Sequence, residues 1–147
     1  MEFHEIVAIT GMPGLYRALS SKSNGVVVSS LEDGKSQFIS ARVHNISTLE
    51  NITIYLENDE SRELKYVFSD FMKIENETPA PDAKASNDEL RNYFTKAIPA
   101  HDKVRVHNSD IKKMVRWYHI LKSNNLLKTE EEWKKLEEKP EEEKAAD

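Results

Sequence analysis

The sequence predicts an α+β fold, in which a small antiparallel five-stranded barrel is followed by a helix, a linker and a C-terminal helical hairpin. Two observations give this class. The first part of the chain contains short runs rich in β-branched residues, separated by tight-turn signals. The second part places apolar residues at helical spacing on one face, after a proline-containing break near residues 75–86.

Five short apolar runs predict the strands. They are Ile6–Thr10, Leu15–Leu19, Val26–Val28, Ser36–Val43 and Ile52–Leu56. Asn24-Gly25 and Asp33-Gly34 are hairpin signals, because both residues of each pair tolerate a positive φ. The intervals between runs are too short for crossover helices, so neighbouring strands are expected to pair antiparallel. A meander or a small curled barrel follows from this spacing.

A helix is expected directly after the strands. The segment from Asp59 to Ser61 supplies capping residues, and the apolar residues that follow share one helical face: Leu64, Val67, Phe68 and Phe71. Residues 75–86 then contain two prolines and small side chains, which is typical of a linker. We therefore divide the chain into a barrel-like domain (1–74), a linker (75–86), a helical domain (87–126) and a partly disordered acidic tail (127–147).

Two further helices are expected in the helical domain. The first starts at Ser86 or Asn87 and ends before Pro99, and its apolar stripe consists of Leu90, Tyr93, Phe94 and Ala97. The second is capped by Ser109 and runs from Asp110 to about Ser123, with Asn124-Asn125 as its stop. The connector that carries Val104 and Val106 looks extended. A marginal helix is expected after Thr129, as far as Pro140.

Composition excludes several classes of protein. The 147 residues contain no cysteine, which removes disulfides, thiolate metal sites and cysteine nucleophiles. The N-terminus is acidic and polar, unlike a signal peptide, and no apolar run approaches the roughly 20 residues that span a bilayer. We expect a cytoplasmic protein that has no membrane partner.

The charge is distributed unevenly along the chain. The net charge is −5, yet residues 86–126 carry eight Lys or Arg against four Asp or Glu. This predicts a basic helical face for a protein or nucleic-acid partner, with the acidic tail as a further possible ligand. The candidate contact residues are Lys103, Arg105, Lys112, Lys113, Arg116, Trp117 and His119. A solvated helix face opposite a packed one explains the same residues, and this alternative stays open.

No motif in the sequence predicts catalysis. The turn from Gly11 to Gly14 lacks the glycine spacing and the following Lys-Ser/Thr pair of a phosphate loop. His101, Asp102, His107 and Asp110 lie close in sequence, but their spacing matches neither a helical His pair nor a zinc finger. We therefore expect no catalytic residue, no cofactor and no metal site.

The aromatic residues Tyr93, Phe94, Trp117 and Tyr118 are expected to form the core of the helix pair. A two-helix unit of this size buries little apolar area by itself. It must therefore dock on the barrel, pair with another copy of the chain, or bind a partner.

Several motifs resemble an uncharacterised bacterial family. The opening stretch Ile6–Tyr16, with its Gly-x-Pro-Gly-Leu-Tyr turn, and the segment Leu49–Leu56 are similar to the family's N-terminal domain. Leu90–Phe94, Asp102–Val106 and the stretch from Ser109 to Tyr118 resemble the helical domain that follows it. The resemblance covers residues 1 to about 126. It implies an SH3-like barrel and a bacterial cytoplasmic origin, and it supplies no catalytic residues.

The function expected from these observations is a non-catalytic binding or interaction protein of unknown partner. The uneven charge and the thin helical core motivate this expectation. The alternative is a structural or regulatory protein that self-associates through its helices. An enzyme of unknown class ranks third, because no residue pattern favours it.

Overall fold

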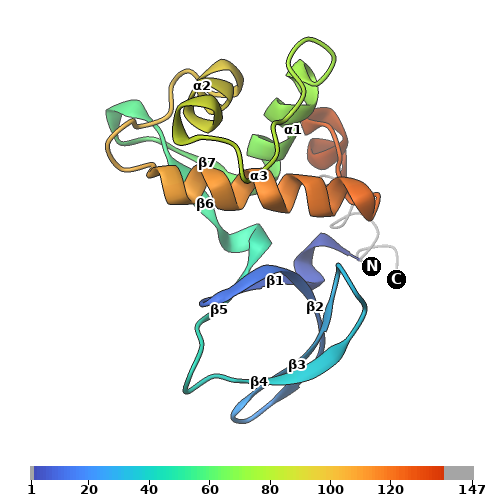
Figure 1. Ribbon diagram of the computed structural model, residues 1–147. Coiled ribbons are helices and arrows are strands. Elements are labelled where there is room, and N and C mark those ends of the chain that lie inside the picture. Colours follow the sequence, from blue (N-terminus) through green and yellow to red (C-terminus); the bar gives the residue numbers. More distant parts are fainter. Residues whose placement is uncertain (1, 138–147) are drawn as a thin grey trace.

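The computed structural model describes residues 2–137, in which a curled antiparallel sheet lies beneath a layer of helices (Figure 1). The sheet contains β1 (Ile6–Ile9), β2 (Met12–Lys22), β3 (Gly25–Ser30), β4 (Ser36–Ser40) and β5 (Ile46–Thr48). Their order is β4-β3-β2-β1-β5, and every neighbouring pair is antiparallel. The α+β class and the five antiparallel strands are therefore confirmed.

Both predicted hairpins are present. β2 and β3 meet at Asn24-Gly25, where Lys22 pairs with Gly25. β3 and β4 meet at Asp33-Gly34, where Gly34 has a φ of 74° and the Asp33 carboxylate accepts the Lys35 N–H at 2.9 Å. A residue with a side chain is strained at this positive φ, which explains why glycine stands there.

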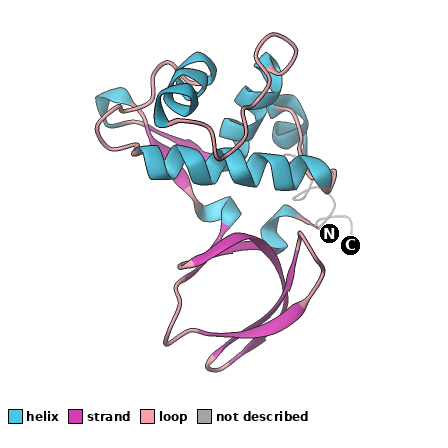
Figure 2. Cartoon of the chain, viewed as in Figure 1, coloured by secondary structure: helices cyan, strands magenta, loops and turns pink. Residues whose placement is uncertain are grey.

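The expected small SH3-like barrel is not closed, because the sheet curls strongly but stays open (Figure 2). β4 pairs only with β3, and β5 pairs only with β1, so these two strands are the edges. A barrel requires that its first and last strands pair with each other.

The fifth strand also differs from the prediction. It is Ile46–Thr48, whereas the predicted run Ile52–Leu56 lies largely in another sheet. A 3₁₀ turn, Leu49–Asn51, separates the two, and its Leu49 side chain is fully buried. Burial of Leu49 redirects the chain, which carries the more apolar segment away from β1.

A second, two-stranded sheet follows the 3₁₀ turn. It consists of β6 (Thr53–Tyr55) and β7 (Ser61–Glu63), and α1 (Leu64–Ile74) begins directly after β7. The predicted cap at residues 59–61 is therefore wrong, because Ser61 belongs to a strand and Glu63 precedes the helix. The predicted apolar face is confirmed, since Leu64, Val67, Phe68 and Phe71 are all buried.

The predicted helical hairpin consists of α2 (Asn87–Ala97) and α3 (Asn108–Ser123). Ser86 caps α2 by accepting the Glu89 N–H at 3.2 Å. α3 is capped by His107 and not by Ser109, through a capping box in which the Asp110 carboxylate accepts the His107 N–H at 3.0 Å. None of the helices in residues 2–137 is long and apolar enough to cross a membrane.

The segment between α1 and α2 lies against the protein. Ala80, Ala83 and Ala85 of the predicted linker pack on the main core. α1 contacts α2 directly, because Phe71 meets Tyr93 and Phe94 with ring centroids 5.1 and 6.0 Å apart. The domain boundaries drawn from the sequence stay a prediction. In space, however, α1 packs together with the two later helices. The predicted extended connector is wrong, because residues 103–106 form turns.

The helices share their core with the sheet. β1 is buried on both sides: Ile6 faces the helices, whereas Val7 and Ile9 face the inside of the curled sheet. Leu15 of β2 and Leu49 lie on the same upper face, and Ile6, Leu15 and Leu49 are all fully buried. The small helical unit therefore docks on the sheet, which is one of the three outcomes expected from its size.

A polar contact accompanies this docking. Gly14, with a φ of 87°, lies where an added Cβ would be 2.3 Å from the Glu32 carboxylate. Glu32 in turn accepts a hydrogen bond from the Arg116 guanidinium of α3 at 3.1 Å. Gly14 thus leaves room for an ion pair between sheet and helix.

The helix that the sequence predicts after Thr129 is confirmed in the C-terminal segment (residues 126–137). Residues 130–137 are helical, and Trp133 is buried edge-on against Phe3 at 5.0 Å. Glu130 forms a 2.6 Å ion pair with Arg62, and Glu137 pairs with Lys65. These carboxylates contact β7 and α1, not the basic helix α3. The rest of the predicted tail, residues 138–147, lies outside the described residues.

Phe71 is the residue whose truncation we expect to be most costly. Its ring has no exposed surface and contacts four other aromatic rings, those of Phe68, Tyr93, Phe94 and Tyr118. Phe71→Ala should lower the free energy of unfolding by about 3–5 kcal/mol, measured by urea denaturation. Phe38→Ala is the matched control, because Phe38 is 47% exposed, and it should change stability by less than about 1 kcal/mol. Equal effects of the two changes on stability would contradict the central role of Phe71 in the core.

Docking of the C-terminal segment should weaken in acid. Hydrogen bonds from Arg62 and from Lys65 hold the pKa of Glu130 and of Glu137 below its usual value. The stabilisation is present above the ordinary carboxyl pKa and is lost as pH falls through the lowered values. In a Trp117→Phe background, Trp133 fluorescence should shift to the red below about pH 4.5.

The double variant Glu130→Gln, Glu137→Gln is the control for this acid response. Its Trp133 emission should not change between pH 7 and pH 3, while circular dichroism reports whether the fold persists. A wild-type emission spectrum that is constant over the same range would refute the role of these two ion pairs.

Candidate functional site

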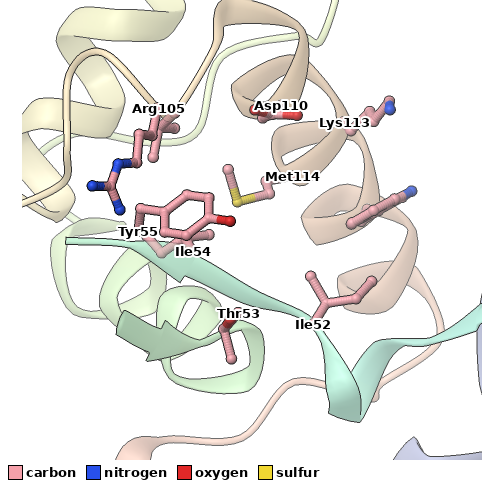
Figure 3. A pocket seen from close by; sticks show the side chains of 10 residues that line it. Ile52, Thr53, Ile54, Tyr55, Arg105, Asp110, Lys113 and Met114 are labelled. Atoms are coloured by element: carbon pink, nitrogen blue, oxygen red, sulfur yellow. The ribbon is translucent and has the colours of Figure 1, made fainter. Parts of the chain in front are cut away.

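An open groove lies between β6 and the N-terminal half of α3 (Figure 3). We call it the β6–α3 groove, and its volume is about 250 Å³. It is lined by Ile52, Thr53, Ile54, Tyr55, Arg105, Val106, Asp110, Lys113, Met114 and Trp117.

The groove has an apolar floor and a polar rim. Ile54, Val106 and Met114 are buried, so they form a floor that is packed into the main core. The Tyr55 ring is 53% exposed and lies under the Arg105 guanidinium, 5.2 Å from its centroid. This combination offers a partner an apolar contact next to an aromatic ring and positive charge.

The period of α3 explains which of its side chains reach the groove. Asp110, Lys113, Met114 and Trp117 are three or four residues apart, so they share one side of the helix. Met114 points inward, and Lys113 lies at the outer edge of the same side (Figure 3). The capping box at His107 fixes where the helix starts and therefore which residues face β6.

Most of the predicted basic face is already paired within the chain. Lys103 lies 3.4 Å from Glu57, and Arg105 lies 3.1 Å from Asp59 and 3.6 Å from Asp102. Arg116 pairs with Glu32 across the interface between sheet and helix. Exposed ion pairs of this kind contribute little to stability, but they reduce the charge offered to a ligand.

The remaining predicted residues have different environments. Lys112 and Lys113 are exposed, and neither forms an ion pair within the described chain. The His119 ring is already engaged within the chain, because its Nε2 lies 2.8 Å from the Pro81 carbonyl oxygen. Of the seven predicted contact residues, the groove brings together Arg105, Lys113 and Trp117, and it does not include the other four.

The sequence did not indicate the other wall of the groove. The sequence predicts that Thr53 and Tyr55 belong to the five-stranded sheet and that Met114 is a core residue. The residue that could have indicated this wall is Tyr55. It is a large aromatic residue in the short run Ile52–Leu56, which has polar residues on both sides, and it alternates with the apolar Ile54. Only the pairing of β6 with β7, in a separate sheet, places Tyr55 beside α3.

The local His and carboxylate cluster has structural roles. The His101 ring is fully buried against Phe94, and its Nδ1 lies 2.7 Å from the Ile98 carbonyl. Its Nε2 faces Arg91, a group that can only donate, at 3.3 Å. These partners require the neutral ring with the proton on Nδ1, and burial lowers the His101 pKa accordingly.

The carboxylates of the same cluster accept hydrogen bonds from backbone N–H groups. Asp102 accepts the Val104 and Arg105 N–H groups at 2.9 and 3.0 Å, which lowers the pKa of its carboxyl. Asp110 closes the capping box of α3. Within residues 2–137, no three His, Cys, Asp or Glu side chains gather in a way that could hold a metal ion.

We expect folded His101 to stay neutral at pH values where an unfolded histidine is charged. The unfolded ring takes up a proton near pH 6.5 and the folded ring does not, so the free energy of unfolding should fall as pH drops below 6.5. Nitrogen-15 NMR of the ring should show the Nδ1–H tautomer at pH 6. In His101→Gln the pH dependence should be smaller. A charged His101 at pH 6 would refute this assignment.

Comparisons with known proteins divide the chain at the 3₁₀ turn. Residues 3–49 match the family model described as Domain of unknown function (DUF5606), and residues 52–121 match Domain of unknown function (DUF6852). A solution NMR structure of a protein from Bacteroides vulgatus is 35% identical to the chain. The match covers 86% of this chain and 89% of that one, with a TM-score of 0.67. No curated protein matches the chain.

Proposed function

Because this chain belongs to the bacterial family that joins a DUF5606 domain to a DUF6852 domain, whose functions are unknown, we propose a function from the groove itself. The chain is a non-catalytic binding protein, and its partner docks in the β6–α3 groove. The observation that carries this proposal is the exposed Tyr55 ring beside an apolar floor and Lys113, a lysine that forms no ion pair within residues 2–137.

The size of the groove favours a macromolecular partner. Pockets for drug-sized ligands usually enclose about 300–1,000 Å³, and this groove is smaller. A volume of about 250 Å³ suits one or two anchoring side chains of a protein. Aromatic and arginine residues at the site, here Tyr55, Trp117 and Arg105, are the types most frequent at the energetic centres of protein interfaces.

The charge pattern favours a protein over a nucleic acid. Binding to a phosphate backbone rests on several lysines or arginines that each neutralise a phosphate. Lys103, Arg105 and Arg116 are already paired with carboxylates of the chain, which leaves Lys113 as the lysine of the groove that forms no ion pair within residues 2–137. One such cation suits an acidic side chain on a protein partner.

The proposal predicts charge-dependent binding at Lys113. The probes are an acidic peptide that contains one phenylalanine and a single-stranded RNA oligonucleotide, each titrated against nitrogen-15-labelled protein in low salt. The peptide should shift the amide signals of β6 and α3, and Lys113→Glu should weaken its binding about fivefold, equivalent to ~1 kcal/mol. Added salt should weaken it as well.

Lys96→Glu is the matched control, because Lys96 is an exposed lysine of α2 that lies outside the groove. It should leave binding of the peptide unchanged. An equal loss in both variants would show that only the overall charge matters. Preferential binding of the RNA would favour the nucleic-acid partner instead.

A further inference from the structure

We propose that the partner enters the β6–α3 groove as an extended strand, which pairs with the open edge of β6 and presents an acidic side chain to Lys113. This inference rests on the proposed function, because it describes how the same groove is occupied.

The backbone of β6 has one occupied edge and one open edge. The Leu64 N–H donates to the Ile52 carbonyl, and the Leu56 N–H donates to the Glu60 carbonyl. The polar backbone groups of residues 52, 54 and 56 therefore point toward β7. Because these groups alternate along a strand, those of Thr53 and Tyr55 point the opposite way.

A hydrogen bond confirms the direction of the second edge. The Tyr55 carbonyl accepts the Asp102 N–H at 2.9 Å, on the side away from β7. The Thr53 N–H, the Thr53 carbonyl and the Tyr55 N–H face the same side. In residues 2–137 none of these three groups has a backbone partner from another element.

The groove runs along this open edge. Its lining includes four consecutive residues, 52 to 55. Side chains of a strand alternate between its two faces, so a groove on one face would be lined by every second residue. Four residues in succession mean that the backbone edge itself lines the groove, opposite α3.

Part of this edge already pairs with another segment. Leu56 and His101 form an antiparallel bridge, in which the Glu57 N–H also donates to the Ala100 carbonyl at 2.8 Å. After Asp102 the chain turns away, and the edge at Thr53 is left open. A bound peptide would continue along β6 the strand pairing that residues 100–102 begin.

An extended peptide suits this edge better than a helix. A helix satisfies its own backbone groups, so it would cover the Thr53 and Tyr55 groups without bonding them. A buried donor or acceptor without a partner costs free energy, whereas a strand pairs with all three groups. Strand addition to an open sheet edge is an established mode of peptide recognition.

The residues that line the groove determine which side chains a bound peptide should carry. Met114 and Trp117 offer an apolar contact to one side chain of the strand. Lys113, which has no ion pair within residues 2–137, favours a carboxylate at the outer edge of the groove. The occupant is therefore an extended segment that combines an apolar residue with a neighbouring aspartate or glutamate.

The test begins with a random nonapeptide library displayed against the full chain and counter-selected against the Lys113→Glu variant. The recovered peptides should carry an acidic residue. Methylation of alternate backbone nitrogens in a recovered peptide should weaken its binding about tenfold or more, while methylation of the intervening ones should have little effect. Bound peptide should slow hydrogen exchange of the Thr53 and Tyr55 amides.

A protein variant gives a second readout. Thr53→Pro removes one donor from the open edge and leaves the β6–β7 pairing intact, because the Thr53 N–H faces away from β7. It should abolish peptide binding, whereas Thr53→Val should retain it, with thermal unfolding as the check that both variants fold.

The outcomes separate this inference from the proposed function. Some peptides could shift the amide signals of the groove but bind as helices, or bind equally well after backbone methylation. Such peptides would refute strand pairing with β6 and would still support the groove as the binding site. A selection that yields no peptide directed to the groove would overturn both.

Discussion

The structure depends on one shared apolar core between the upper face of the curled sheet and the helices. Ile6, Leu15 and Leu49 form the sheet side of this core and are fully buried. Phe71 and its neighbouring rings form the helical side. Because neither part buries enough apolar surface alone, each supports the other, and the domain of residues 3–49 is joined physically to the domain of residues 52–121.

This core also decides where binding can occur. The basic helix was expected to seek a partner because its own core looked thin, but docking on the sheet already covers its apolar side. Arg116 forms an ion pair with Glu32 at the interface between sheet and helix, and Arg105 forms one with Asp59. What remains open is the groove between α3 and the short strand β6. The proposed partner site is therefore a consequence of how the two domains pack.

Local patterns predicted the elements well where one periodicity dominates. The hairpins at Asn24-Gly25 and Asp33-Gly34 and the buried face of α1 follow from turn chemistry and helical spacing. The order of the strands was harder, because Ile46–Thr48 is less apolar than Ile52–Leu56, yet it is the one that pairs with β1. That choice depends on the burial of Leu49, which is a tertiary contact. The ion pairs Lys103–Glu57, Arg105–Asp59 and Arg116–Glu32 join residues far apart in sequence, so no local pattern could reveal them.

The shared core is tested most directly by following the two domains separately during unfolding. Amide NMR signals of β3 and of α2, recorded in the same urea titration, report the sheet and the helices in one sample. A shared core predicts that both sets of signals disappear with the same midpoint and the same steepness. Helical signals that persist at urea concentrations where the sheet has unfolded, or the reverse, would contradict it.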